Sequence, residues 1–149
     1  MKTIVISGAR SNIGKTTLAG RMSGLLPGSV CVKLGHGEEK EGMDNRFYPS
    51  GTPYGRIKEE NPQADFLIIE SNRILDEIEP DLTVYLPAED PKPSALIAAK
   101  RADLTRGCTG SDEEAGLVAG RLGIDAVTAA GIVRLVCVDS GPEMDAENG

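Results

Sequence analysis

The sequence predicts an α/β protein built in three layers around a mostly parallel central sheet. Runs of β-branched and aliphatic residues alternate along the chain with segments of helical or loop character, and this alternation is typical of parallel sheets. The length of 149 residues, with 40% hydrophobic and 26% charged residues, suits one globular domain. We therefore expect a single domain over residues 1–140 and an acidic, flexible tail over residues 141–149.

Each expected strand is a continuous apolar run, which indicates burial on both faces of the sheet. Aromatic residues make up only 3% of the chain, so Val, Ile, Leu and Ala must form the core. The expected strands occupy residues 2–8, 29–35, 65–71, 81–88 and 131–138.

Two expected helices are marked by apolar residues at helical spacing and by start or stop signals. The first covers residues 15–26, and a Pro-Gly pair directly after it ends the helix. The second covers residues 111–124, where Ser111 and Glu114 have the spacing of a capping box.

The remaining segments are less regular. A short helix is expected within residues 54–63. Residues 35–55 are rich in Gly, Pro and charge, which predicts a loop. Residues 95–104 fit either a helix or a strand followed by a polar loop.

Composition argues against several functional classes. A net charge of −7 and a pI near 4.8 disfavour a broad basic surface for nucleic acid. The three cysteines, Cys31, Cys108 and Cys137, are far apart and form no Cys-x-x-Cys pair, so we expect neither a disulfide framework nor a structural zinc site. The single His36 cannot build a multi-histidine metal site.

The sequence predicts a cytoplasmic protein without a membrane segment. No apolar run approaches the roughly 20 residues of a membrane-spanning helix, and the apolar run at the N-terminus is too short for a signal peptide.

A phosphate-binding motif follows the first expected strand. Residues 9–16 have the P-loop pattern, between a strand ending in Gly8 and the first helix. Such a loop wraps its backbone N–H groups around a phosphate, and the helix N-terminus adds positive charge. Lys15 is expected to contact the β- and γ-phosphates and Thr16 to ligate Mg²⁺. The expected nucleotide-binding residues of this segment are Ala9, Arg10, Ser11, Asn12, Ile13, Gly14, Lys15, Thr16 and Thr17.

A P-loop needs an acidic partner, and the sequence offers two. The apolar run before Glu70 places this carboxylate at the carboxyl end of a buried strand, the edge where ligands bind in open α/β sheets. Asp44, in the polar loop after the second strand, could reach Mg²⁺ or position a water. We therefore expect Lys15, Asp44 and Glu70 as catalytic residues, and Thr16, Glu70 and Asp44 as metal ligands.

A second motif concerns the base of the nucleotide. Residues 100–104, Lys-Arg-Ala-Asp-Leu, resemble the Asn-Lys-x-Asp-Leu segment with which many GTPases hold guanine. Asp103 would accept hydrogen bonds from the donor edge that guanine has and adenine lacks. The stem of Arg101 would cover the base. This pattern favours GTP, with ATP as the alternative.

The order of these motifs resembles a family of P-loop proteins of molybdenum cofactor maturation, the molybdopterin-guanine dinucleotide biosynthesis proteins B. Shared features are the P-loop after the first strand, a second strand ending in Lys33-x-x-His36, and Asp44 ahead of the small-Gly-small triplet at residues 50–52. The last is an apolar strand ending in Glu70. The resemblance covers roughly residues 1–90.

That resemblance implies a GTP-binding, weakly hydrolysing, Mg²⁺-dependent homodimer. It also implies a partner, the nucleotidyltransferase that joins GMP to molybdopterin. In a wider group of similar proteins, a second Lys inside the loop reaches across a dimer to the partner's nucleotide, and Arg10 holds that position here. Arg suits bidentate phosphate contact.

Three activities remain open from the sequence. The first is a slow nucleoside triphosphatase used as an accessory in cofactor maturation. The second is an ATP-dependent kinase or ligase for a small molecule, with the polar loop as acceptor site. The third is a non-catalytic nucleotide-binding module that acts as a switch.

Overall fold

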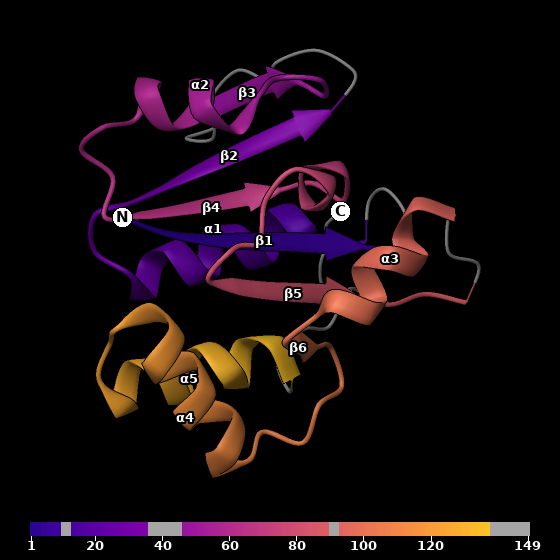
Figure 1. Cartoon of the computed structure of the whole chain (residues 1–149). Helices are drawn as coiled ribbons and strands as arrows, with labels where there is room; N and C mark the ends of the chain where they lie inside the picture. Colours follow the sequence, from indigo (N-terminus) through magenta and orange to yellow (C-terminus); the bar gives the residue numbers. More distant parts are fainter. Residues whose placement is uncertain (10–12, 36–45, 90–92, 138–149) are drawn as a thin grey trace.

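The computed structural model describes residues 1–9, 13–35, 46–89 and 93–137. Within them, six strands form one sheet in which all neighbours are parallel, in the order β3-β2-β4-β1-β5-β6 (Figure 1). The strands are β1 Lys2–Gly8, β2 Ser29–Gly35, β3 Arg46–Pro49, β4 Phe66–Glu70, β5 Leu82–Leu86 and β6 Leu104–Thr105. The predicted α/β class with a parallel sheet is confirmed.

Helices flank this sheet on both faces. They are α1 Lys15–Leu25, α2 Tyr54–Glu60, the 3-10 helix η1 Arg73–Asp76, α3 Pro93–Arg101, α4 Asp112–Leu122 and α5 Ala126–Cys137. The crossover through α1 runs from β1 to β2 on one side, whereas the crossover through α3 runs from β5 to β6 on the other. Because parallel crossovers are right-handed, opposite directions place the two helices on opposite faces. The three-layer prediction is therefore confirmed.

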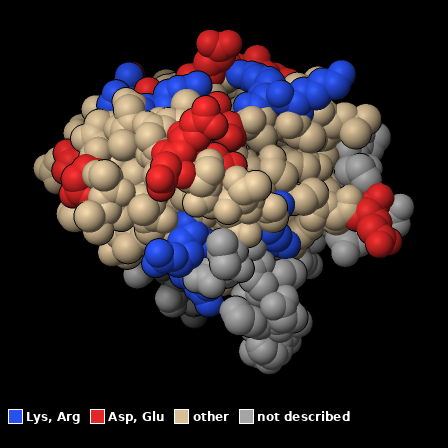
Figure 2. Space-filling view, turned by 90° about the horizontal axis from the view of Figure 1, so that it is seen from below, with Lys and Arg blue, Asp and Glu red and all other residues tan. Residues whose placement is uncertain are grey.

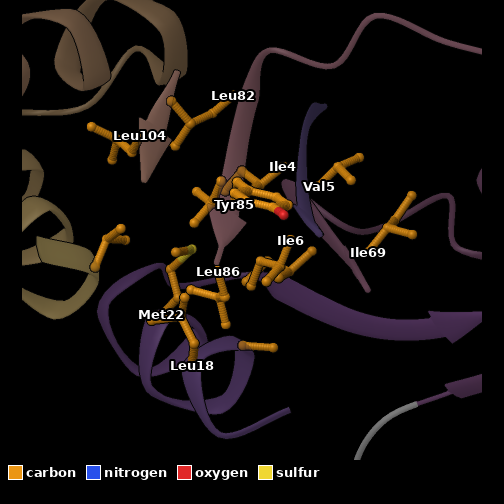
Figure 3. Close-up of a cluster of buried hydrophobic side chains, with 14 of the residues drawn as sticks. Ile4, Val5, Ile6, Leu18, Met22, Ile69, Leu82, Tyr85, Leu86 and Leu104 are labelled. Carbon is orange, nitrogen blue, oxygen red and sulfur yellow. The ribbon is translucent and has the colours of Figure 1, made fainter. Parts of the chain in front are cut away.

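The core lies on the central strands. Ile4, Val5 and Ile6 of β1 have no exposed surface, because β4 and β5 pair with β1 on its two sides. Figure 3 shows Leu18 and Met22 of α1 in the same cluster of buried side chains. Full burial of such a side chain stabilises the fold by about 1.5–3 kcal/mol, so this cluster holds α1 against the sheet.

The prediction of a strand over residues 131–138 is wrong, because residues 131–137 belong to helix α5. A short apolar run does not by itself distinguish a buried strand from a buried helix. Here the buried positions recur at intervals of three and four, which is one face of a helix. They are Ala129, Ile132, Val133, Val136 and Cys137. Helix α5 also lies close to α1: a Cβ added at Gly131 would lie 3.3 Å from Leu25 Cδ1.

Other elements refine the sequence-based expectations. Residues 35–55, expected as a loop, contain β3 and the start of α2, and the ambiguous segment 95–104 contributes most of helix α3. The two-residue strand β6 was not predicted. The capping box of α4 is confirmed: Ser111 Oγ accepts from the Glu114 N–H at 3.2 Å, and Glu114 Oε1 accepts from the Ser111 N–H at 2.8 Å.

The cysteine prediction also needs correction. Cys108, in the loop after β6, forms a disulfide with Cys137 at the end of α5, and their Cα atoms are 4.6 Å apart. The 29-residue separation hid this pair in the sequence, because the turn between α4 and α5 brings the two positions together. Cys31 is buried in β2, where its thiol donates to the Ala19 carbonyl at 3.6 Å.

No single helix in the described part of the chain has both the length and the apolar composition needed to cross a membrane. Only α4 and α5 taken together meet those criteria, and they are bent by 115° at the break between them.

Candidate functional site

The candidate site lies at the carboxyl edge of the sheet, where the chain leaves β1. The connections after β1 and after β5 run in opposite directions, toward β2 and toward β6 (Figure 1). Such a divergence between neighbouring strands opens the crevice in which parallel sheets bind ligands. The two strand ends are joined here, because the Ala9 N–H donates to the Leu86 carbonyl at 2.8 Å.

The amino end of α1 has the backbone geometry of an anion site. Its N-cap residue, Gly14, has φ 104° and ψ 10°, a left-handed conformation that L side chains rarely adopt. Gly14 also supplies no capping side chain, which leaves the first N–H groups of α1 to other acceptors. These N–H groups and the helix dipole attract a phosphate.

Two predicted magnesium ligands meet at this helix end. Thr16 Oγ1, in the first turn of α1, donates to Glu70 Oε1 at 2.7 Å. Glu70 ends β4, beside β1, in register with Ile6 of β1 and Lys33 of β2. The two motifs are 54 residues apart in the sequence, and the parallel pairing of β1 with β4 brings them to one edge.

Two opposing effects act on the Glu70 carboxyl, and burial is the larger of them. Burial raises the pKa of the Glu70 carboxyl above its ordinary value, because desolvation disfavours the charged form. The hydrogen bond from Thr16 and the positive charges of Lys33 and Lys15 favour the carboxylate. A divalent cation at this position would stabilise the carboxylate further.

Ile13 and Lys15 of the P-loop lie close to the end of β1. A Cβ built on Gly8 would lie 2.8 Å from Ile13 Cγ2 and 3.3 Å from Lys15 Cδ. Ile13 is buried with 6% exposure, and it fixes the returning loop in the core. The aliphatic stem of Lys15 therefore passes over Gly8, and its charge is close enough to Glu70 to influence the Glu70 pKa.

Asn72 is a site residue that the sequence-based reasoning missed. Its Oδ1 accepts from the Gly8 N–H at 2.9 Å, and its Nδ2 donates to the Gly8 carbonyl at 2.9 Å. Both backbone groups at the start of the P-loop are thus held by one amide side chain. The available signal was its place two residues after Glu70, where the chain leaves the carboxyl edge.

Arg106 is the second missed residue. It follows β6, and its Nη2 donates to the Ile13 carbonyl at 2.6 Å, while its N–H donates to the Tyr85 carbonyl at 3.0 Å. The guanidinium therefore joins the loop after β6 to the P-loop, 93 residues away. Nothing in the local sequence of Arg106 indicates this contact, which depends on β6 lying at the end of the sheet.

The remaining predicted residues of the site divide into two groups. Ala9 is fully buried and Thr17 is exposed on α1. The other four predicted site residues, Arg10, Ser11, Asn12 and Asp44, lie outside the described residues, as does His36.

Asp103, the residue predicted to read the base, lies apart from the P-loop in this structure. This residue directly precedes β6, so it lies at the amino edge of the sheet, away from the P-loop. Its Oδ2 accepts from the Thr83 N–H at 2.9 Å and from Arg121 Nη1 at 3.3 Å. A guanine-reading segment must instead follow a strand, at the carboxyl edge where the nucleotide binds.

Arg101 is likewise used within the fold. Its Nη1 donates to the Leu75 carbonyl and its Nη2 donates to the Ile78 carbonyl, the latter at 3.0 Å. The guanidinium thus ties α3 to the segment around η1. That Arg101 covers a base stays a prediction, and these contacts do not support it.

The side chains at this helix end fit a nucleoside triphosphate bound together with Mg²⁺. Thr16 and Glu70 offer a hydroxyl and a carboxylate, the hard oxygen ligands that Mg²⁺ takes from proteins while keeping waters and phosphate oxygens. Lys15 and the start of α1 offer positive charge to the phosphates. Figure 2 looks onto the side of α4 and α5, and on this face acidic and basic side chains are interspersed.

Comparison of the chain with models of known protein families, with curated proteins and with solved structures finds no match.

Proposed function

We propose that this chain binds a nucleoside triphosphate together with Mg²⁺ at the P-loop and hydrolyses it slowly. The observation that supports this proposal most strongly is the 2.7 Å hydrogen bond between Thr16 Oγ1 and Glu70 Oε1 at the start of α1. A chance glycine turn has no reason to face a buried acid from another strand. The pairing of a P-loop hydroxyl with a strand-end carboxylate is what a Mg²⁺ site needs.

The residues of the chain divide the work of such a site. Lys15 and the N–H groups of α1 hold the phosphates, and Thr16 and Glu70 hold the metal ion directly or through its waters. The bound Mg²⁺ supplies positive charge that neutralises the phosphate oxygens. Glu70 already interacts with Thr16 and lies near two lysines, which suits a metal ligand better than a general base. We therefore expect slow turnover.

The finer assignment rests on the resemblance of the motifs. We propose that the nucleotide is GTP, that the protein acts as a homodimer, and that it assists the nucleotidyltransferase of molybdenum cofactor maturation. Lys33 supports this assignment, because it begins the Lys-x-x-His segment and lies in register with Glu70. Asp103, which was predicted to read guanine, lies at the amino edge, so the proposal of GTP rests on the resemblance alone. The melting-temperature comparison of GTP with ATP tests it.

Thermal stability with and without nucleotide tests the proposal. The melting temperature is measured with GTP, ATP or GMP, with Mg²⁺ or EDTA, and phosphate release is then followed. We expect a Mg²⁺-dependent rise with a triphosphate. Lys15→Ala should weaken binding by about 10- to 100-fold, since a hydrogen bond to a charged group contributes about 1.5–3 kcal/mol.

Matched variants separate site effects from general destabilisation. Glu70→Gln should lose the Mg²⁺ dependence, whereas Glu59→Gln, an exposed glutamate on α2, should retain it. Lys100→Ala, at an exposed lysine of α3, is the control for Lys15→Ala. A melting temperature that neither triphosphate raises would refute the proposal. A rise with ATP alone would refute the assignment of GTP.

A further inference from the structure

The loop after β6 is attached to the rest of the fold at two nearby residues, Arg106 and Cys108. Arg106 reaches the P-loop through the Ile13 carbonyl at 2.6 Å. Two residues later, Cys108 is bonded to Cys137 at the end of α5. The same short loop therefore connects the P-loop to a disulfide, and neither contact is used by the phosphate and magnesium chemistry described above.

We propose that Cys108 and Cys137 form a reversible thiol–disulfide site that controls nucleotide affinity by fixing Arg106 against the P-loop. This inference rests on the proposed nucleotide binding and adds a regulation to it. The oxidised state holds the loop, and the reduced state releases it.

The position of the disulfide suits reversible chemistry. Cys137 is buried with 7% exposure, whereas Cys108 is only half-buried and its neighbours Gly107 and Thr109 are exposed. A thiolate can thus approach Cys108 Sγ from solvent, and Cys137 is the leaving group. Cys31 is buried in a different strand and is not part of the pair.

The disulfide is the covalent tie between this loop and α5, and Thr109 Oγ1 also donates to Glu114 Oε1 of α4 at 3.2 Å. Gly107 has φ 92° and Gly110 has φ 75°, and a Cβ added at Gly107 would meet no atom within 4 Å. The Cys108 N–H donates to the Thr105 carbonyl at 2.9 Å, which is a local turn contact. Opening the disulfide therefore removes the covalent link to α5 from a loop that contains two glycines at positive φ, and this loop begins directly after Arg106.

A negative charge lies beside the sulfurs. A carboxylate oxygen of Glu114 lies within 4.8 Å of both sulfur atoms. Hydrogen bonds, the largest from the Ser111 backbone, lower the pKa of Glu114 and keep it charged. A negative charge at this distance disfavours the thiolate form of both cysteines, so the reduced pair is held as neutral thiols.

The redox step balances with a dithiol as reductant. Its thiolate attacks Cys108 Sγ to give a mixed disulfide, and Cys137 leaves as a thiolate that takes up a proton. The second thiol of the reductant then attacks the reductant's first sulfur atom, which is bonded to Cys108 in the mixed disulfide. This step releases Cys108 as a thiol and closes a cyclic disulfide in the reductant. One S–S bond is exchanged for another, and two electrons and two protons pass to the protein.

The experiment compares the full chain in both redox states. One sample is oxidised with glutathione disulfide and the other is reduced with dithiothreitol, which is then removed. Alkylation of the denatured protein by N-ethylmaleimide, read by mass spectrometry, should count one thiol in the oxidised chain and three in the reduced chain. Affinity for a fluorescent nucleoside triphosphate with Mg²⁺ should be about tenfold higher in the oxidised chain, by loss of one charged hydrogen bond on reduction.

Variants assign the effect to these residues. Cys108→Ser and Cys137→Ser should bind like the reduced chain under both treatments, and Cys31→Ser should keep the tenfold contrast. Arg106→Ala should bind equally in both states, and Arg106→Lys should restore part of the contrast. The redox comparison of the unmodified chain needs no variant to fold.

Three results would overturn the proposal. The first is an oxidised chain with three reactive thiols, and the second is equal affinity in two states that both bind nucleotide. The third is one Zn²⁺ retained by each reduced chain in metal-free buffer, which would assign Cys108, Cys137 and Glu114 to a metal site. Absence of nucleotide binding in either state would refute the proposed function and the coupling, while the thiol count would still decide the disulfide.

Discussion

Replacing Gly8 with Ala tests how closely the P-loop must approach β1. The new Cβ would lie 2.8 Å from Ile13 Cγ2, whereas carbon atoms in good contact are about 3.5–4.0 Å apart. Either Ile13 or the backbone must therefore move by about 0.7 Å or more. Ile13 is β-branched and buried, so it cannot rotate away easily.

The expected cost follows from this overlap. Overpacking of this kind destabilises by about 1–3 kcal/mol, which corresponds to a fall in melting temperature of roughly 2–12 °C at about 2–4 °C per kcal/mol. The displacement also moves the loop that carries Lys15, and a shift near 1 Å at a binding site can lower activity by about 10²-fold. Urea unfolding and nucleotide binding measure the two effects.

Gly20→Ala is the matched control. Gly20 lies in α1 and an added Cβ would meet no atom within 4 Å, so Ala should stabilise the helix by up to about 1 kcal/mol. The two substitutions add the same methyl group with opposite expected signs. If Gly8→Ala unfolded at the wild-type urea concentration and kept full nucleotide affinity, the close approach deduced here would be incorrect.

Three further predictions follow from single contacts. Burial raises the pKa of Glu70 above 4.5, so the folded state binds the Glu70 proton more tightly than the unfolded state does. This contribution to the free energy of unfolding is fully present below pH 4.5 and is lost as the pH rises through the pKa of the folded state. Metal-free wild type should thus lose stability relative to Glu70→Gln between pH 4.5 and neutrality in urea unfolding, and parallel pH profiles would contradict this. Asn72→Ala should cost about 1–3 kcal/mol by leaving both Gly8 backbone groups unpaired and should weaken nucleotide binding as measured by fluorescence; a stability loss with unchanged affinity would make Asn72 purely structural. Ser111→Ala should lower the free energy of unfolding by about 1 kcal/mol through loss of the cap, and a change under about 0.3 kcal/mol in urea would refute that role.

The parts of the fold that the sequence predicted well are those set by local chemistry. The strands ending at Gly8 and Glu70 are continuous apolar runs, and burial on both faces of a parallel sheet demands this composition. The capping box at Ser111 and Glu114 also depends on residues three apart. Such signals are complete within a few residues of sequence.

The errors arose where a local signal is shared by two structures. The run predicted as a strand over residues 131–138 is rich in Val, and residues 131–137 form a helix that packs against α4, α1 and β6. Asp103 matched a guanine-reading segment, but that reading required a strand before it rather than after it. Short runs of sequence leave these alternatives open.

The sequence by itself determined the P-loop, the parallel α/β class and the acid at the end of β4, because each depends on residue types at fixed spacing. Tertiary structure alone decided which distant groups support the loop. Asn72 reaches Gly8 because β4 pairs with β1, Arg106 reaches Ile13 because β6 ends at the same edge, and Cys108 meets Cys137 because α5 turns back toward β6. The order of strands in a sheet is a long-range property, and no local pattern in the chain encodes it.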